Sequence, residues 1–194
     1  GRLYDKFRNR LMLPVIDTRG DVVGFGSRVI DNSEPKYMNT TETITYSKRR
    51  ILYGLNLAKK TKRPNIILCE GNLDVVTLHQ AGFDNAVASM GTALTVEQTR
   101  LLSRFTKELV LCYDNDNAGQ LATQRALELL NNSEFSVKVL KLPNRMADGK
   151  PTKQDADDFI KNYGPAAFEN LLSGSENGVE FRMTQIAARY DLTS

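Results

Sequence analysis

The sequence predicts an open α/β fold built around a mainly parallel sheet. From residue 66 onward, short apolar segments of strand length alternate with longer segments of helical character. The predicted strands cover residues 66–69, 85–89, 109–113 and 135–141. The predicted helices cover residues 73–81, 95–105, 117–131, 156–162 and 165–173. Because neighbouring parallel strands are joined by crossover helices, this alternation indicates a parallel sheet flanked by helices.

Local signals mark several helix boundaries. Thr95 and Gln98 have the spacing of a capping box at the start of the second helix. The pair Gly164-Pro165 separates the last two helices, since glycine favours a helix end and proline a helix start. Residues 51–63 also have helical character, and this run ends in cationic residues followed by a proline.

The regions outside the alternating pattern differ from it. Residues 11–30 predict a hairpin with a polar turn, whereas residues 31–50 are polar and irregular. Residues 176–194 resemble the start of another helical unit. We therefore divide the chain into a basic, mixed α/β N-terminal part over residues 1–47, an α/β domain over 48–174, and the start of a C-terminal helical subdomain over 175–194.

Composition excludes several classes of protein. The chain is 41% hydrophobic and 25% charged, which is ordinary for a globular domain. No apolar run approaches the roughly 18–20 residues that span a bilayer, and no signal segment is apparent, so we expect a cytoplasmic protein without a membrane partner. Cys69 and Cys112 lie inside apolar strand patterns and are expected to be buried, reduced thiols. No cysteine pair has zinc-ligand spacing, so no zinc is expected.

Charge is distributed unevenly along the chain. Residues 1–65 hold 14 Lys and Arg against 6 Asp and Glu, a net charge of +8, whereas residues 66–194 hold 12 against 17, a net charge of −5. A basic segment beside an acidic one suggests that the first binds a polyanion and the second a metal ion. Two solvated faces of unlike charge are the simpler alternative.

Two acidic clusters lie at the ends of predicted strands. Glu70 and Asp74 follow the strand 66–69, and Asp114 and Asp116 follow the strand 109–113. Ligands of open α/β sheets bind beyond the carboxyl ends of the strands, so these clusters should meet. Carboxylates brought together repel, which raises the pKa of one of them unless a cation intervenes. Hard oxygen ligands suit Mg²⁺, which in turn suits phosphoryl transfer.

A third cluster, Asp155 with Asp157, could complete a two-metal site. All three clusters also have structural explanations. Asp74 could complement a helix dipole, one aspartate of the second pair could cap the next helix, and the third pair could simply open a helix. None of these explanations accounts for Glu70 at the end of a buried strand.

Two further patterns suggest phosphate binding. The loop Ser89-Met90-Gly91-Thr92 could present backbone N–H groups to a phosphate, although such a sequence is often only a turn. In the basic segment, cationic residues are interleaved with tyrosines, a combination that can follow a phosphate backbone and stack on unpaired bases. These residues are Arg28, Lys36, Lys48, Arg49 and Arg50, with Tyr37 and Tyr46.

The motif Glu70-Gly71-x-x-Asp74, followed by Tyr113-Asp114-x-Asp116-x-Ala118-Gly119, resembles the Toprim domain of bacterial primases, topoisomerases and some nucleases. Other stretches are similar to the bacterial-type DnaG primases. They are Tyr4 to Arg10, Gly24 to Arg28, Pro35 to Asn39, Ser47-Lys48, Leu52 to Leu55, and Ala88 to Thr92. The resemblance covers nearly the whole chain. It implies that residues 1–47 are part of the basic N-terminal subdomain of a primase core and that residues 48–174 are a catalytic domain with a Toprim-type sheet.

The resemblance implies roles for individual residues. The implied metal acids are Glu70, Asp114, Asp116, Asp155 and Asp157, of which the first three are the implied catalytic residues and Glu70 is the candidate general base. The implied nucleotide- or template-binding residues are Arg28, Lys36, Tyr37, Asn39, Lys48, Asp74, Gly91 and Thr92. Two positions depart from the family pattern: Asn115 replaces a usual glycine and Ala156 a usual proline. Neither change removes a ligand.

The function implied is DNA-templated synthesis of short RNA primers from ribonucleoside triphosphates, dependent on Mg²⁺ or Mn²⁺. The expected partners are a single-stranded DNA template, ribonucleoside triphosphates and, through a region outside this sequence, a replicative helicase. We expect an excised core fragment without the zinc-binding module of such primases. A Toprim nuclease or topoisomerase fragment and a non-catalytic DNA-binding scaffold are the alternatives.

Overall fold

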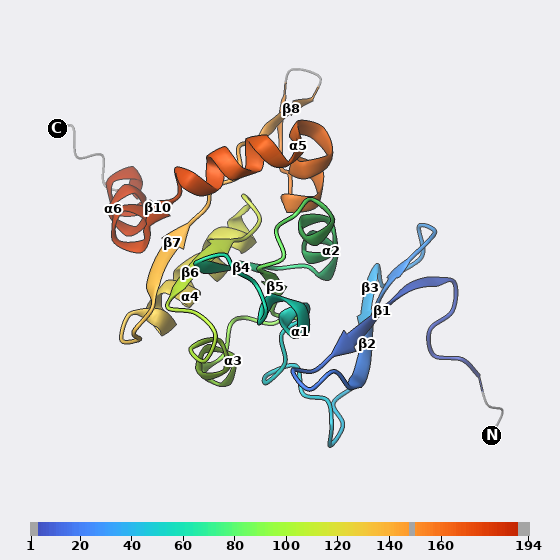
Figure 1. The fold of residues 1–194 in the computed structure, drawn as a ribbon. Helices are drawn as coiled ribbons and strands as arrows, with labels where there is room; N and C mark the ends of the chain where they lie inside the picture. The colour runs from blue at the N-terminus through green and yellow to red at the C-terminus, as the bar shows by residue number, and fades with distance from the viewer. Residues whose placement is uncertain (1–3, 148–149, 190–194) are drawn as a thin grey trace.

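The computed structural model describes residues 4–147 and 150–189, and its centre is a five-stranded sheet in the order β10-β7-β6-β4-β5 (Figure 1). The strands are β4 (Asn65–Cys69), β5 (Ala86–Ala88), β6 (Glu108–Cys112), β7 (Ser136–Val139) and β10 (Glu176–Asn177). The first four pair in parallel, and only the short β10 is antiparallel. The predicted open, mainly parallel sheet is therefore confirmed.

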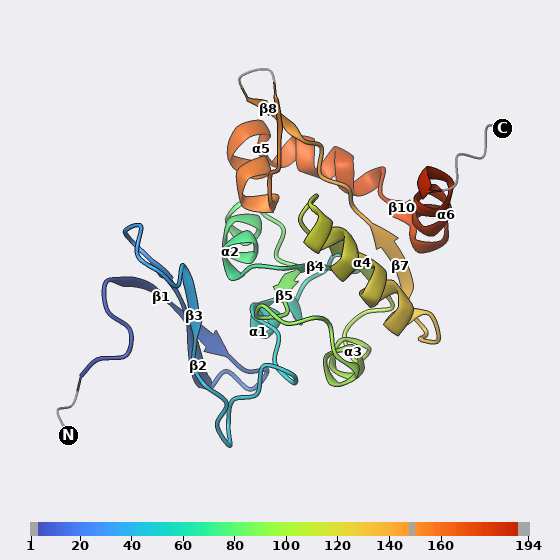
Figure 2. The same ribbon diagram turned by 180° about the vertical axis from the view of Figure 1, so that it is seen from behind.

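Helices cover both faces of this sheet (Figures 1 and 2). They are α1 (Leu55–Ala58), α2 (Asn72–Gln80), α3 (Val96–Leu102), α4 (Asn117–Leu130), α5 (Ala156–Ser173) and α6 (Gly178–Arg189). Alternate residues of β4 face opposite layers, as the two-residue period of a strand requires. Ile66 and Leu68 pack in one core with residues of α3 and α4, and Ile67 and Cys69 pack in the other with residues of α2 and α5.

The two cysteines are free, as predicted. Cys69 and Cys112 are buried and stand beside each other in the parallel register of β4 and β6. Among the helices of the described residues, none is both long and apolar enough to cross a membrane.

A separate antiparallel sheet precedes the central one and lies to its side (Figure 1). It consists of β1 (Arg10–Ile16), β2 (Val22–Val29) and β3 (Tyr37–Asn39). The predicted hairpin is confirmed, but β3 lies in the segment predicted to be irregular. A small core of Val15, Tyr46 and Met90 joins this sheet to the loop after β5.

The helix predicted over residues 51–63 is wrong for most of its length. Only Leu55–Ala58 is helical, because Tyr53 instead exchanges two backbone hydrogen bonds with Ala88, and Gly54 adopts a left-handed φ of 81°. Tertiary pairing with β5 thus overrides the local helical pattern.

Of two further features near the C-terminal end, the sequence analysis missed one and predicted the other. The short hairpin of β8 (Arg145–Ala147) and β9 (Lys150–Thr152) was not predicted. The predicted break at Gly164-Pro165 is confirmed as a kink in α5, where Gly164 has a φ of 80°.

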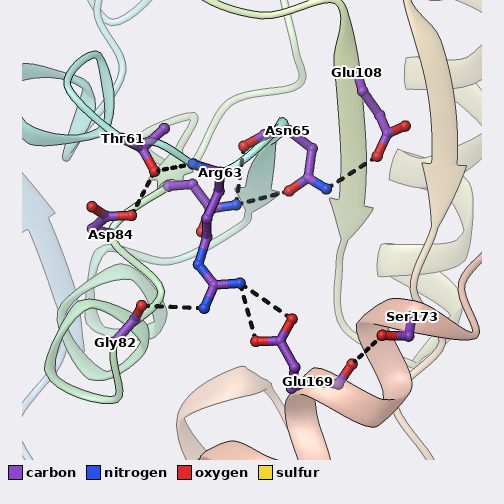
Figure 3. Close-up of polar contacts among 9 residues, drawn as sticks. Thr61, Arg63, Asn65, Gly82, Asp84, Glu108, Glu169 and Ser173 are labelled. Atoms are coloured by element: carbon purple, nitrogen blue, oxygen red, sulfur yellow. Dashed lines mark hydrogen bonds and ion pairs between the residues drawn. The ribbon is translucent and has the colours of Figure 1, made fainter.

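Arg63 joins three elements on the side of the sheet that α2 and α5 cover (Figure 3). Its Nη1 donates to both carboxylate oxygens of Glu169 in α5, at 3.2 and 3.0 Å, and its Nη2 donates to the Gly82 carbonyl at 3.4 Å. The guanidinium also lies 4.7 Å from the ring centre of Phe83, which packs edge-on against Phe168 of α5. These contacts fix the second half of α5 against the turn after α2.

Leu78 tests the packing of α2 on the sheet. Its side chain is fully buried, so Leu78→Ala should lower the free energy of unfolding by about 2–5 kcal/mol. Leu57 is 55% exposed on α1, so Leu57→Ala serves as the matched control and should cost less than about 1 kcal/mol. Urea denaturation measures both, and equal losses would contradict the assignment of Leu78 to the core.

Candidate functional site

The site begins where two neighbouring parallel strands end. Cys69 of β4 pairs with Cys112 of β6, so the residues that follow leave the sheet side by side. The backbone N–H of Asp114 donates to Oε1 of Glu70 at 3.1 Å, which joins the two strand ends directly. Burial, and next the charge of Asp114, raise the pKa of Glu70. Burial likewise raises the pKa of Asp114.

Gly119 allows this junction to be compact. A Cβ at this position would lie 2.0 Å from the Asp114 carbonyl oxygen and 2.9 Å from Oε1 of Glu70. Contacts that short do not occur between real atoms, so the first turn of α4 approaches the strand ends only because residue 119 has no side chain.

Asp116 and Asp155 hold their carboxylates in the same way. Each is the residue that caps a helix: Oδ1 of Asp116 accepts from the Gly119 N–H at 2.8 Å, and Oδ1 of Asp155 accepts from the Asp158 N–H at 2.8 Å. The capping explanation is therefore correct for both residues, yet it occupies only one oxygen of each. The hydrogen bond from Gly119, and next the ion pair with Lys153, lower the pKa of Asp116.

Lys153 is a site residue that the sequence analysis missed. Its Nζ lies 2.9 Å from Oδ2 of Asp116 and 3.7 Å from Oδ2 of Asp114. Its ammonium group therefore offsets part of the negative charge of these two carboxylates. In the sequence, Lys153 is marked only by its position two residues before Asp155, and that position does not reveal toward which residues its side chain points.

Asp74 is the most deeply buried acid of the group, at 7% exposure. Its carboxylate accepts backbone hydrogen bonds from Gly71 and Asp157, both at 3.1 Å. Burial, and next the charge of Asp155, raise the pKa of Asp74 to about 7. The hydrogen bond to the N–H of Asp157 joins α2 to the start of α5, so Asp74 positions the third acidic cluster.

The carboxylate of Asp157 has other partners. Its Oδ2 accepts from Lys161 at 2.6 Å, and its Oδ1 accepts from the Thr77 hydroxyl. Oxygens of Asp155, Asp157 and Asp158 nevertheless lie within 4.8 Å of one another. The structure thus brings Asp155 beside the other site acids and leaves Asp157 at their margin.

A cleft of about 280 Å³ opens above these acids, and we call it the acidic cleft. Its walls include Tyr37, Asn39, Glu70, Asp74, Gly91, Asp114 and Asp155. The N-terminal sheet therefore contributes one wall, held in place by the hydrogen bond from Nδ2 of Asn39 to the Met90 carbonyl at 3.2 Å. Burial raises the pKa of Tyr37, and the nearby carboxylates add to this effect.

The predicted basic residues are not all beside the acids. Arg28 and Lys36 lie over the Tyr37 ring, at 5.9 and 5.6 Å from its centre, and line a separate groove of about 720 Å³ on the N-terminal sheet. The backbone of Lys48 is bound to Gln98 of α3 and to Glu42, and this residue does not line the acidic cleft. Thr92 lines a different cleft, on the α4 side of Glu70.

The donor set suits a hard divalent cation. Hydrogen bonds from the backbone occupy one oxygen each of Glu70, Asp116 and Asp155, and the second oxygen of Asp116 is paired with Lys153. Burial and mutual repulsion raise the pKa values of Glu70, Asp74 and Asp114, and Lys153 opposes this rise only in part for Glu70 and Asp114. A cation with oxygen ligands would relieve both.

Comparison with known proteins identifies the family. Residues 67–160 match the family described as Toprim-like, and residues 1–59 match the family described as DNA primase catalytic core, N-terminal domain. The DNA primase of Clostridium acetobutylicum is 44% identical over 184 residues, covering 94% of this chain and 30% of the relative. The chain thus spans about a third of the length of the curated relatives it matches.

Solved structures agree with the sequence match. The E. coli primase catalytic core superposes with a TM-score of 0.86 at 38% identity, covering 100% of this chain and 61% of that one. A DnaG primase catalytic domain bound to single-stranded DNA gives a TM-score of 0.85 at 37% identity, covering 98% of this chain and 59% of that one. Together with the acids at the ends of β4 and β6, these matches show that the chain belongs to the bacterial DnaG primase family and corresponds to part of its catalytic core.

Proposed function

We propose that this chain carries the site for DNA-templated synthesis of short RNA primers in DNA replication. The observation that carries the proposal is the acidic cleft, which places Glu70, Asp114 and Asp155 opposite Tyr37 of the basic N-terminal sheet. One wall can hold a cation and the phosphates it neutralises, and the other offers an aromatic ring for bases. The division into parts at residues 1–47, 48–174 and 175–194 belongs to this proposal.

We infer that the acids bind Mg²⁺ or Mn²⁺. The ligands would be the second oxygens of Glu70, Asp116 and Asp155, together with Asp114, while Asp157 adds negative charge at the margin. When bound, such an ion neutralises phosphate charge and orients the reacting groups. Lys153 contacts two of these carboxylates, those of Asp114 and Asp116, so a bound ion would displace its ammonium group or make it a partner of the bound phosphates.

The reaction proposed is nucleotidyl transfer from a ribonucleoside triphosphate. The 3′-hydroxyl of the growing primer attacks the α-phosphorus, and pyrophosphate leaves. Glu70 is placed to accept the hydroxyl proton, because the Asp114 N–H fixes one of its oxygens and its raised pKa favours proton uptake. Asp74 orients the start of α5, and hence Asp155, through the N–H of Asp157.

The N-terminal sheet is the proposed nucleic-acid surface. Arg28 and Lys36 would bind phosphates of the single-stranded template, while Tyr37 stacks on a base and Asn39 and Gly91 line the nucleotide side of the cleft. Lys48 would extend this surface toward α3. A replicative helicase would bind a part of the full-length protein outside this sequence.

Asp114→Asn tests the metal assignment. Losing one charge at the junction of β4 and β6 should abolish Mn²⁺-dependent nucleotide binding in calorimetry and reduce primer synthesis by at least a hundredfold. The free energy of unfolding should stay the same or rise, because a repulsive charge is removed.

Asp21→Asn is the matched control for this variant, since Asp21 is exposed in the turn between β1 and β2. Metal-dependent nicking of plasmid DNA by the wild-type chain, without primer synthesis, would favour a nuclease instead. Undetectable metal binding in the wild-type chain would favour a DNA-binding scaffold.

The raised pKa of Asp74 predicts a pH-dependent stability in metal-free buffer. Between about pH 4, where an unfolded aspartate titrates, and about pH 7, the folded protein keeps a proton that the unfolded chain has lost. The free energy of unfolding should therefore fall as pH rises through this window, by at most about 1.4 kcal/mol per pH unit for this one group.

Urea denaturation in EDTA from pH 4 to pH 8 measures this dependence. Asp74→Asn should flatten the slope, whereas Asp21→Asn should keep it. Identical slopes for wild type and Asp74→Asn would show that Asp74 does not carry the proton. Adding Mg²⁺ at pH 8 should restore stability to the wild-type chain, because the cation compensates the same repulsion.

Gly119→Ala tests the close approach of α4 to the strand ends. The added methyl group has no space beside the Asp114 carbonyl, so the first turn of α4 must move away, and Mn²⁺ affinity should fall at least tenfold. At Gly174, an added Cβ would have ordinary contacts at 3.7 and 3.8 Å, so Gly174→Ala is the control and should leave affinity unchanged. If calorimetry gave Gly119→Ala the same Mn²⁺ affinity as the wild-type chain, the need for glycine at residue 119 would be refuted.

A further inference from the structure

A second cleft, of about 220 Å³, lies on the α4 side of Glu70, and we call it the α4 cleft. It shares Glu70 and Gly91 with the acidic cleft, so the two open on either side of the same carboxylate. Its other walls come from the loop after β5 and from one face of α4.

The face of α4 in this cleft is formed by Ala118, Ala122 and Arg125. Spacings of four and three residues place these side chains along one side of a helix. The two alanines leave the space open, and Arg125 is the only cationic residue among the described residues that line the cleft. The hydrogen bonds and ion pairs of the described residues include none made by the exposed Arg125 side chain, in contrast to Lys153, which is paired with Asp116.

The opposite wall is a loop held rigid by its own hydroxyl groups. The Ser89 hydroxyl donates to the Thr92 carbonyl, and the Thr92 hydroxyl donates to the Ser89 carbonyl, both at 2.8 Å. The hydroxyl of Thr92 is therefore committed within the loop. The backbone N–H groups of Gly91 and Ala93 have no acceptor among the described residues, and no atom lies within 4 Å of where a Cβ of Gly91 would be.

We propose that the α4 cleft binds a phosphate group, with Arg125 and the N–H groups of Gly91 and Ala93 as its ligands. A guanidinium offers paired donors that match two phosphate oxygens, and unpaired N–H groups complete an anion site. This inference rests on the proposed function, and it assigns to Arg125 the positioning of a phosphate beside Glu70. Such a phosphate belongs either to the nucleoside triphosphate or to the backbone of the primer–template strand.

Two binding experiments with the 194-residue chain in Mn²⁺ distinguish these sources. One measures the affinity for ATP without nucleic acid, and the other the affinity for a short RNA primer annealed to a DNA template without nucleotide. Arg125→Gln should weaken at least one of them by about tenfold, the usual effect of losing a charged hydrogen bond. Arg125→Lys should recover part of the loss, because it keeps the charge but not the paired donors.

Two readouts separate ligand binding from a merely structural effect. Affinity for Mn²⁺ alone should be unchanged in Arg125→Gln. If the strand is the ligand, the slope of log affinity against log salt concentration should become smaller by the equivalent of about one phosphate contact. Arg100→Gln is the matched control, because Arg100 is exposed on α3 and lines neither cleft.

A loss of affinity confined to ATP assigns the cleft to the triphosphate, and a loss confined to the hybrid assigns it to the strand. A loss of affinity for both probes assigns the cleft to a phosphate shared by the two. If Arg125→Gln binds both probes as tightly as Arg100→Gln, the α4 cleft proposal is wrong while the proposed function stands. If the wild-type chain binds neither probe, both proposals fail.

Discussion

Repulsion between carboxylates is the constraint around which this structure is organised. Glu70, Asp74, Asp116 and Asp155 each accept a hydrogen bond from a backbone N–H of a neighbouring element or of the helix they cap. Backbone donors of this kind stabilise a charge without adding a mobile side chain. They hold the acids at fixed positions, and they leave one oxygen each of Glu70, Asp116 and Asp155 without a backbone donor. In the proposed function, the negative charge that remains uncompensated would favour the binding of a cation.

The apolar cores on the two faces of the sheet keep the strand ends that carry these acids in place. Strands β4 and β6 are buried on both faces, so their ends cannot move relative to each other without disturbing a packed core. Arg63 and Glu169 fix the second half of α5 to the turn after α2, and Asp74 fixes its beginning. The start of α5, with Asp155, is thereby held at the mouth of the acidic cleft. The proposed binding of highly charged phosphates would require such rigidity, because misplaced dipoles would have to reorganise when the ligand arrives.

Much of this could be predicted because the signals were local. Alternating apolar runs predicted four parallel strands, and the acids after 66–69 and 109–113 had to meet because parallel strands end at one edge. Residues 51–63 were mispredicted because the pairing of Tyr53 with Ala88 is a contact between distant segments, which a helical periodicity cannot reveal. Strand β3 was missed for the same reason, since the three residues Tyr37–Asn39 become a strand only beside β2.

The sequence by itself determined the fold class, the apolar pattern of both layers and the identity of the acids, because each depends on residue type and short-range spacing. Only the tertiary structure decided what each carboxylate touches. It showed that Lys153 pairs with Asp114 and Asp116, that Asp157 turns toward Lys161, and that the lysine at 48 lies away from the acidic cleft. Side-chain direction depends on which distant elements pack together, and that information is not contained in local spacing. The second cleft beside Glu70 likewise exists only because α4 packs against the loop after β5.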